Sequence, residues 1–359
     1  MKEFWSPRIR DMVPYTPGEQ PKNRKWIKLN TNENPYPPSP MALEAIRAAA
    51  GEGLRLYPDP EGTALRETFS AFCGADIRPE QIFLGNGSDE VLAFAFQAFF
   101  DPQREIVFPD ITYSFYPVYA ALFGLKTREI PLNEDFSIPV EQFFGQKGGV
   151  VLCNPNAPTG RALPLESIRK ILEANPEAVV LVDEAYVDFG GTSTAVLLAD
   201  HPNLLVVGTL SKSRSLAGLR VGYALGSVNL LAGLNCVKNS FNSYTLDRLA
   251  LAGAEGALRD QAYFQATRDK ILQTRARTAA RLKELGFTVC DSSANFLFAS
   301  HRDVPAKELL DGLRSRGILV RWWNRPRISN HLRITIGTDQ EMDALCAALE
   351  ELLRSPRQG

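Results

Sequence analysis

An apolar run that ends in a lysine decides the fold of this chain: Leu204-Leu205-Val206-Val207-Gly208-Thr209-Leu210-Ser211-Lys212. Two similar runs precede it, Val150-Val151-Leu152 and Val179 to Val182. Polar residues follow the three runs at nearly equal intervals, namely Asn154, Asp183 and Ser211. Each interval has room for a strand, a crossover helix and a loop. The spacing therefore predicts βαβ units in an α/β fold, with a mostly parallel central sheet covered by helices on both faces.

The residues beyond each predicted strand are candidates for a ligand site, because ligands bind outside the carboxyl ends of parallel strands. Lys212 has this position, and Arg220 follows it closely. A lysine amine is protonated in water and becomes a nucleophile only where its site lowers its pKa. A single Lys/Arg pair is more often a solvated loop than a site, so the pair needs support from other residues.

The length of 359 residues favours one large and one smaller domain. We predict an N-terminal arm over residues 1–39, a large domain over 40–255 and a small domain over 256–359, entered through a connecting helix at about 258–286. The first forty residues contain eight prolines, which argues against regular structure in the arm. In the small domain the pattern predicts strands at 296–299, 318–322 and 332–336, and helices at 306–316 and 339–354.

Composition limits the partners and the compartment. The net charge of −1 argues against nucleic acid or an anionic membrane as a partner, so small molecules are expected. The five cysteines are odd in number and show no Cys-x-x-Cys spacing, so we expect reduced, mostly buried thiols and no metal site. Residues 1–10 lack an apolar segment and no run has transmembrane length, so we expect a cytoplasmic protein.

Two further patterns lie near the predicted strand ends. Ile82 to Glu90 describes a strand that passes through a glycine turn into a helix, where backbone N–H groups could hold a phosphate. Taken alone, a simple strand-to-helix turn capped by Ser88 is the commoner explanation of this stretch. Asp183 ends an apolar run, where a buried carboxylate needs a cationic partner, and Tyr186 is close enough in sequence to reach the same space.

Together these groups match the requirements of pyridoxal 5′-phosphate. Its aldehyde needs an amine, which Lys212 offers, and its ring nitrogen needs an anion, which Asp183 offers. Its phosphate needs N–H groups, hydroxyls and a cation, for which the glycine turn, Thr209, Ser211 and Arg220 are candidates.

At this point the chain resembles the fold-type I pyridoxal phosphate aminotransferases of class I and II, and within them the histidinol-phosphate aminotransferases, over nearly its whole length. The motifs that carry the resemblance occur in the family's order: Leu29–Pro35, Tyr57–Pro60, Gly85–Glu90, Asn156–Gly160, Val182–Tyr186, Leu210–Arg220 and Leu332–Thr338. Several motifs in the right order are more specific than any one of them.

The resemblance implies roles for particular residues. Lys212, Asp183 and Tyr186 would be catalytic: an amine that binds the aldehyde and moves a proton, a partner for the pyridinium nitrogen and a donor to the cofactor O3′. Other residues would complete the cofactor site: Ser88, Asp89, Tyr113, Asn156, Thr209, Ser211, Arg220 and Tyr57. Tyr57 would reach the neighbouring subunit's cofactor phosphate, which implies a homodimer.

The resemblance also implies that Arg333 binds the substrate anion and that Arg321 and Tyr15 help to bind a substrate phosphate. One position departs from the family pattern, because the asparagine expected against O3′ is Ala157 in this chain. Either Asn156 replaces it or Tyr186 serves O3′ alone.

The implied activity is a transamination between L-histidinol phosphate and 2-oxoglutarate in histidine biosynthesis. Two alternatives use the same fold and cofactor. Trp322, Trp323 and Tyr113 could form a ring pocket for an aromatic amino acid aminotransferase, and a phosphothreonine-type decarboxylase would instead release CO₂. Substrate preference depends on pocket shape, which spacing does not reveal.

Overall fold

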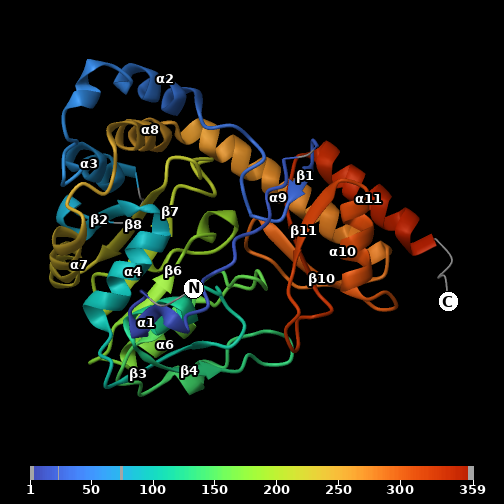
Figure 1. The fold of residues 1–359 in the computed structure, drawn as a ribbon, viewed down its shortest axis with the longest axis horizontal. Helices are drawn as coiled ribbons and strands as arrows, with labels where there is room; N and C mark the ends of the chain where they lie inside the picture. Colours follow the sequence, from blue (N-terminus) through green and yellow to red (C-terminus); the bar gives the residue numbers. More distant parts are fainter. Residues whose placement is uncertain (1–3, 23, 73–75, 355–359) are drawn as a thin grey trace.

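The computed structural model describes residues 4–22, 24–72 and 76–354, so Cys73 lies outside the described residues. These residues form a seven-stranded and a five-stranded sheet, which lie side by side in Figure 1. The long helix α9 (Gln261–Glu284) runs from the larger half to the smaller one (Figure 1).

The large sheet has the order β2-β8-β7-β6-β5-β3-β4. Its strands are β2 (Ile82–Asn86), β3 (Glu105–Pro109), β4 (Lys126–Ile130), β5 (Val150–Cys153), β6 (Val180–Asp183), β7 (Leu204–Thr209) and β8 (Val221–Gly226). β5, β6 and β7 are parallel neighbours, as their apolar runs predict. Among the described strands of this sheet, β8 is antiparallel to both of its neighbours.

Alternate residues of the central strands belong to two separate cores. Leu181 and Leu205 pack into one apolar cluster, whereas Val180 and Leu204 pack into the other. Because side chains alternate across a strand, this division places apolar cover on both faces of the sheet. The described α-helices of this half are α2 (Pro40–Ala49), α3 (Thr63–Phe72), α4 (Gly87–Phe99), α5 (Tyr116–Phe123), α6 (Leu165–Glu173), α7 (Val228–Phe241) and α8 (Arg248–Arg259). The predicted α/β architecture is confirmed.

The small sheet has the order β1-β11-β12-β10-β9. Its strands are β1 (Ile27–Leu29), β9 (Phe287–Val289), β10 (Phe296–His301), β11 (Ile318–Trp322) and β12 (Leu332–Thr335), and it is accompanied by α10 (Ala306–Ser315) and α11 (Asp339–Arg354). The capping box at the start of α11 is present, because Thr338 N donates to Glu341 Oε2 at 2.8 Å and Glu341 N donates to Thr338 Oγ1 at 3.3 Å.

The expectation that the arm lacks regular structure is wrong at two places. The short helix α1 (Pro7–Arg10) begins at a proline, which is suited to a first helical position. β1 pairs in parallel with β11 at the edge of the small sheet. Residues 27–29 contain no proline, so all of their N–H groups are available for the ladder.

No helix within the described part of the chain is both long and apolar enough to cross a membrane. The four described cysteines are free thiols. The expectation that most are buried is wrong, since Cys153 is buried, Cys290 and Cys346 are partly exposed and Cys236 is exposed.

Candidate active site

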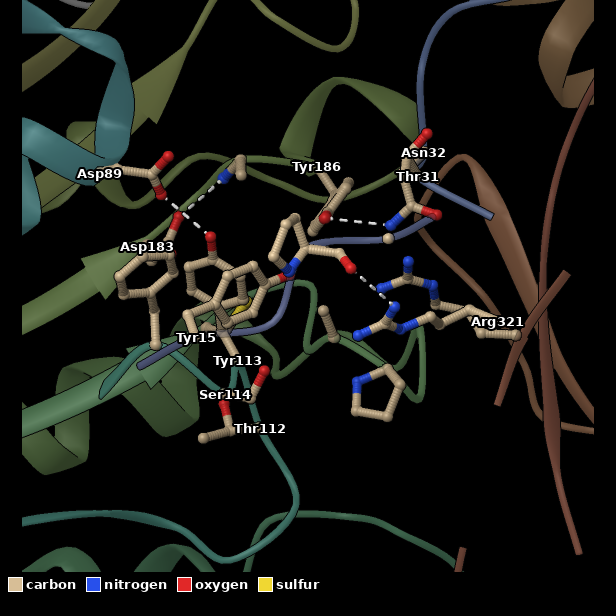
Figure 2. A pocket seen from close by; sticks show the side chains of 18 of the residues that line it. Tyr15, Thr31, Asn32, Asp89, Thr112, Tyr113, Ser114, Asp183, Tyr186 and Arg321 are labelled. Carbon is tan, nitrogen blue, oxygen red and sulfur yellow. Dashed lines mark hydrogen bonds between the residues drawn. The ribbon is translucent and has the colours of Figure 1, made fainter. Parts of the chain in front are cut away.

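A cavity of about 440 Å³ receives side chains from the arm, from the carboxyl ends of β6 and β7 and from the small sheet (Figure 2). The structure brings most of the residues singled out from the sequence to its wall: Tyr15, Ser88, Asp89, Tyr113, Asp183, Tyr186, Thr209, Ser211, Lys212, Arg220, Arg321 and Arg333. Cavities of this size with a few convergent polar groups are typical small-molecule sites.

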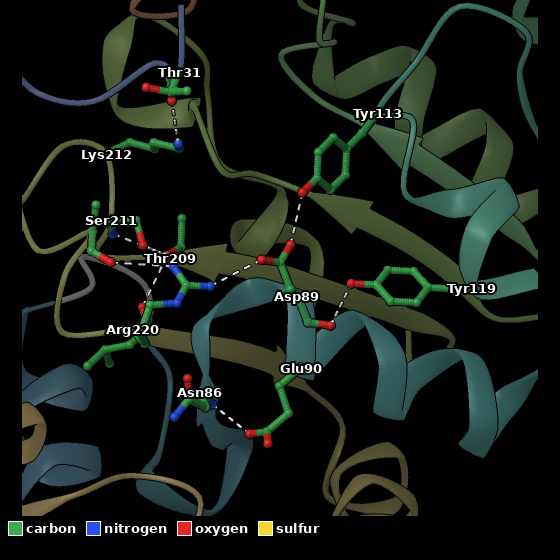
Figure 3. A network of polar contacts seen from close by, with 12 residues as sticks. Thr31, Asn86, Asp89, Glu90, Tyr113, Tyr119, Thr209, Ser211, Lys212 and Arg220 are labelled. Atoms are coloured by element: carbon green, nitrogen blue, oxygen red, sulfur yellow. Dashed lines mark hydrogen bonds and ion pairs between the residues drawn. The ribbon is translucent and has the colours of Figure 1, made fainter. Parts of the chain in front are cut away.

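Lys212 follows β7, and its Nζ donates to the Thr31 carbonyl at 3.3 Å (Figure 3). Burial, together with the nearby Arg333 cation, lowers the pKa of its amine to about 8. A useful fraction of the amine is therefore neutral near physiological pH, as a nucleophile requires.

Asp183 ends β6 and is 2% exposed. The Tyr116 hydroxyl donates to its Oδ2 at 2.9 Å, and Ala185 N donates to its Oδ1 at 3.1 Å. Burial nevertheless raises the pKa of this carboxyl to about 6. Two donors do not offset the loss of water around the charge, so a cation beside Asp183 would be strongly favoured. Tyr116 was not found from the sequence, where it looks like one more core aromatic.

The glycine turn meets Arg220 at the beginning of α4. Arg220 Nη2 forms an ion pair with Asp89 Oδ2 at 3.1 Å, and the Tyr113 hydroxyl donates to Asp89 Oδ1 at 2.9 Å (Figure 3). Gly87 has a φ of +77°, and a Cβ there would collide with the Arg220 guanidinium. The absence of a side chain thus lets the guanidinium lie directly against the helix N-terminus, a favourable place for a phosphate.

Thr209 and Ser211 border the same end of the cavity. Thr209 Oγ1 lies 2.9 Å from Ser211 Oγ and donates to the Val221 carbonyl at 3.1 Å, while Ser211 N donates to Thr209 Oγ1 at 3.1 Å. These hydrogen bonds hold the Thr209 and Ser211 hydroxyls beside the glycine turn, where the hydroxyls could contact an anion.

The opposite end of the cavity is cationic. The Arg333 guanidinium lies 5.3 Å from the Phe296 ring centre and 5.2 Å from the Trp323 ring centre. Its Nη2 donates to the Asn30 carbonyl at 2.9 Å, while its buried Nε has no hydrogen-bond partner. An unpaired buried donor on a cation favours binding of an anion.

The arm lies over this cationic end. Arg321 donates from Nη2 to the Thr16 carbonyl at 3.1 Å and from Nη1 to the Pro17 carbonyl at 3.4 Å. Tyr15 stacks on Phe115 with ring centres 4.4 Å apart. The arm therefore contacts the small sheet through Arg321 and the large domain through Phe115.

The structure does not bring Asn156 or Tyr57 to the cavity wall. Asn156 turns away, because its Oδ1 accepts from Thr112 Oγ1 at 2.9 Å and its Nδ2 donates to the Ile111 carbonyl and to Thr159 Oγ1, both at 3.0 Å. Ala157 lines the cavity instead. Tyr57 is 77% exposed and stacks on Tyr244 at the molecular surface.

Asn32 was also missed by sequence reasoning, although it belongs to the motif Leu29–Pro35. It lines the cavity, is 1% exposed, and its Nδ2 donates to the Tyr186 hydroxyl at 3.0 Å (Figure 2). Asparagine is mostly exposed in folded proteins, so the local sequence gives no sign that Asn32 is buried or that it contacts Tyr186.

Comparisons with known proteins agree with this geometry. Residues 24–349 match the family described as aminotransferase class I and II. The chain is 53% identical to histidinol-phosphate aminotransferase of Clostridium acetobutylicum, over 98% of this chain and 100% of the relative. It is 55% identical to histidinol-phosphate aminotransferase 1 of Bordetella parapertussis, over 99% and 100% of the two chains.

Among solved structures, the chain resembles histidinol-phosphate aminotransferase of Sinorhizobium meliloti, which was crystallised in complex with pyridoxal 5′-phosphate. The TM-score is 0.88 at 27% sequence identity, with 98% of each chain covered. The likeness thus extends over both sheets and the cavity between them.

Proposed function

This chain belongs to the class I and II aminotransferases, and from that premise we propose that it transfers an amino group between L-histidinol phosphate and 2-oxoglutarate. It is a pyridoxal phosphate-dependent transaminase of histidine biosynthesis. The observation that carries the proposal is one cavity that joins a lysine of lowered pKa, a buried carboxylate and two arginines at the far end.

The residues present fit this cofactor. Asp183, whose pKa is raised by burial, is suited to a protonated ring nitrogen, and Lys212 is suited to the aldehyde. The space at Gly87, with Ser88, Arg220 and the Thr209 and Ser211 hydroxyls, is suited to the phosphate. When bound, pyridoxal phosphate supplies an electron sink for the bond that breaks at the substrate α-carbon.

The chain's own residues then divide the remaining work. Lys212 would remove a proton from the α-carbon of the amino donor in one half-reaction and deliver a proton to the α-carbon of the amino acid formed in the other, and with a pKa of about 8 its amine is available in both forms. Tyr186 would donate to the cofactor ring oxygen, and Tyr113, whose hydroxyl donates to Asp89, would contact the ring. The stacked Tyr15 and Phe115 rings line one side of the cavity.

Both substrates are anions, and the cationic end of the cavity is suited to bind them. Arg333 binds the substrate carboxylate or phosphate through its unpaired Nε and a second N–H. Arg321 and Tyr15 contribute to the phosphate subsite. A guanidinium has five N–H donors, so Arg321 can hold the two arm carbonyls and still offer donors to a phosphate.

The active unit we propose is a cytoplasmic homodimer in which Tyr57 reaches the cofactor phosphate of the partner subunit. Tyr57 is 77% exposed, and Leu54 and Leu56 beside it are each more than half exposed. Such a group of exposed apolar side chains favours a protein contact. Sedimentation should give a dimer, and Tyr57→Phe should raise the Kd for pyridoxal phosphate several-fold. A monomer with wild-type cofactor affinity would contradict this assembly.

Steady-state rates with histidinol phosphate, phenylalanine and phosphothreonine at matched 2-oxoglutarate test the activity. We expect histidinol phosphate to have the highest kcat/KM and phosphothreonine to release no CO₂. Arg333→Ala should lower kcat/KM for donor and acceptor alike by about 100-fold, because each anion loses a bidentate partner. A preference for phenylalanine would instead establish an aromatic aminotransferase, and CO₂ release a decarboxylase.

A further inference from the structure

Asn32 connects the arm to both halves of the molecule at one buried point. Its backbone N donates to Thr335 Oγ1 at 3.0 Å, and its carbonyl accepts from Asn295 Nδ2 at 3.0 Å. Its side chain accepts from Thr335 Oγ1 at its Oδ1 and donates from its Nδ2 to the Tyr186 hydroxyl, both at 3.0 Å. Thr335 lies on β12 of the small sheet, whereas Tyr186 follows β6 of the large one.

The backbone of Asn32 is adapted to this position. Its φ of +55° lies in the left-handed region, where asparagine and glycine are tolerated and most other residues are strained. The two backbone hydrogen bonds hold the main chain of Asn32, and the two side-chain hydrogen bonds hold its amide in one orientation. The amide therefore presents a fixed donor to Tyr186.

These contacts set the direction of the Tyr186 hydroxyl. An amide nitrogen only donates, so the Tyr186 oxygen must be the acceptor in this bond. The hydroxyl proton is then left for another acceptor, and Tyr186 lines the cavity. Along the series from Thr335 through Asn32 to Tyr186, each group donates to the next.

The direction of this bond matters more because Ala157 stands where the family pattern has an asparagine. Ala157 has no side-chain donor, and the Asn156 amide is used by Thr112, Ile111 and Thr159. We propose that Asn32 is a positioning residue, an inference that rests on the proposed function. Asn32 orients the Tyr186 hydroxyl so that the hydroxyl donates its proton to the cofactor ring oxygen.

A double-mutant cycle tests this inference in the full-length protein. Asn32→Gly removes the amide without straining the positive φ, and Asn32→Asp keeps the size and the bond from Thr335 but replaces the donor with an acceptor. Each is combined with Tyr186→Phe. The measurements are the Kd for pyridoxal phosphate, the pH midpoint of the bound cofactor's absorbance change and the melting temperature of the apoprotein, all without substrate.

With Tyr186 present, Asn32→Gly should raise the Kd by roughly tenfold and Asn32→Asp by more, because a carboxylate would take the tyrosine proton for itself. Both should move the absorbance midpoint to higher pH, since loss of a donor to the ring oxygen makes the chromophore more basic. In the Tyr186→Phe background, Asn32→Gly should change the Kd for pyridoxal phosphate by less than twofold. It should move the absorbance midpoint by less than about 0.2 pH units. Both limits are roughly the resolution of such a cycle.

Equal effects of Asn32→Gly in both backgrounds would overturn the proposal, because Asn32 would then act independently of Tyr186. An unchanged Kd and midpoint in both Asn32 variants would overturn it as well. Asn32→Asp covers the case in which the glycine variant does not fold. A wild-type enzyme that binds the cofactor but does not aminate with histidinol phosphate would contradict the proposed function alone, since this cycle uses no substrate.

Discussion

Burial of Lys212 lowers the stability of the apoprotein, although it favours the neutral amine that a nucleophile needs. Its pKa of about 8 lies below the ordinary value of 10.5, because of burial and the Arg333 cation. Below pH 8 the buried ammonium opposes folding, and between pH 8 and 10.5 the folded protein sheds a proton that the unfolded chain retains. The apoprotein should therefore gain stability over this window.

Lys212→Met removes that titration. In urea unfolding of the apoprotein, we expect the variant to be more stable than wild type at pH 7 and the difference to narrow by pH 9.5. A difference independent of pH would contradict the assigned pKa.

Burial also opposes the charged form of Asp183, which is a carboxylate. Burial raises its pKa to about 6 from an ordinary value of 3.8, so the stability of the apoprotein falls as pH rises through this window. Asp183→Asn should stabilise the apoprotein at pH 7.5 by on the order of 2 kcal/mol and lose this advantage near pH 4. The same variant should bind pyridoxal phosphate at least 100-fold more weakly, because the ring nitrogen loses its anion.

Denaturant titrations at the two pH values and a cofactor titration measure both effects. Asp200→Asn, at an exposed position, is the matched control and should change neither. A destabilised Asp183→Asn apoprotein at pH 7.5 would show that the bonds from Tyr116 and Ala185 outweigh the burial of the charge.

At the scale of elements, the contact between β8 and the beginning of α4 is the feature that glycine makes possible. A Cβ at Gly222 would collide with the Gly87 carbonyl carbon and with Ser88 N, both backbone atoms that cannot rotate aside. Gly222→Ala should therefore displace the first turn of α4, lower the stability by about 2 to 3 kcal/mol and weaken cofactor binding more than tenfold.

Gly218→Ala is the control, because a Cβ there has open space around it. We expect cofactor affinity and melting temperature close to wild type for this variant. Equal behaviour of the two alanine variants in thermal melts and cofactor titrations would show that the α4 turn adapts to the extra methyl group.

The elements that sequence reasoning found are those with a strong periodic or continuous pattern. β5, β6 and β7 are uninterrupted apolar runs buried on both faces, and α11 has both a capping box and an apolar stripe. β1 was missed because three residues in a proline-rich arm carry too little pattern, and its partner β11 is distant in sequence.

The site divides in the same way. Lys212 and Asp183 follow predictable strands, so their meeting at one sheet edge could be anticipated. Asn32, Tyr116 and the orientation of Asn156 depend on tertiary hydrogen bonds from distant elements, which no local spacing specifies. The roles given to individual site residues stay predictions until variants are measured.

At the scale of the whole molecule, the β11–β12 connection links the small sheet to segments that follow β3 and β4 of the large sheet. Arg327 forms an ion pair with Asp110 Oδ2 at 3.0 Å and donates from Nη2 to the Leu132 and Asn133 carbonyls, each at 2.8 Å. Beside it, a separate apolar cluster contains members from both halves: Ile111, Leu132, Phe136, Phe298 and Ile328.

Arg327→Ala removes the ion pair with Asp110 and the hydrogen bonds to the Leu132 and Asn133 carbonyls, so the position of the small sheet should become less fixed. Because Arg333 and Arg321 lie on the small sheet, we expect kcat/KM for both substrates to fall about tenfold, while the Kd for pyridoxal phosphate changes less than twofold. Arg302→Ala, which removes an exposed arginine of the same domain that pairs only locally with Asp303, should change neither value. A parallel loss of cofactor affinity in Arg327→Ala would mean that this connection supports the cofactor site itself.

The pairing of β1 with β11 has a consequence for how the molecule is made on the ribosome. Ile27 emerges long before its ladder partner Ile318, because almost 300 residues separate them in the sequence. β1 must remain without its ladder while the seven-stranded sheet is synthesised, because a strand cannot complete its ladder before its partner exists. Nascent chains that end before β11 should thus have a formed large sheet and an unpaired β1, and the cavity wall is complete only after Arg321 and Arg333 have emerged.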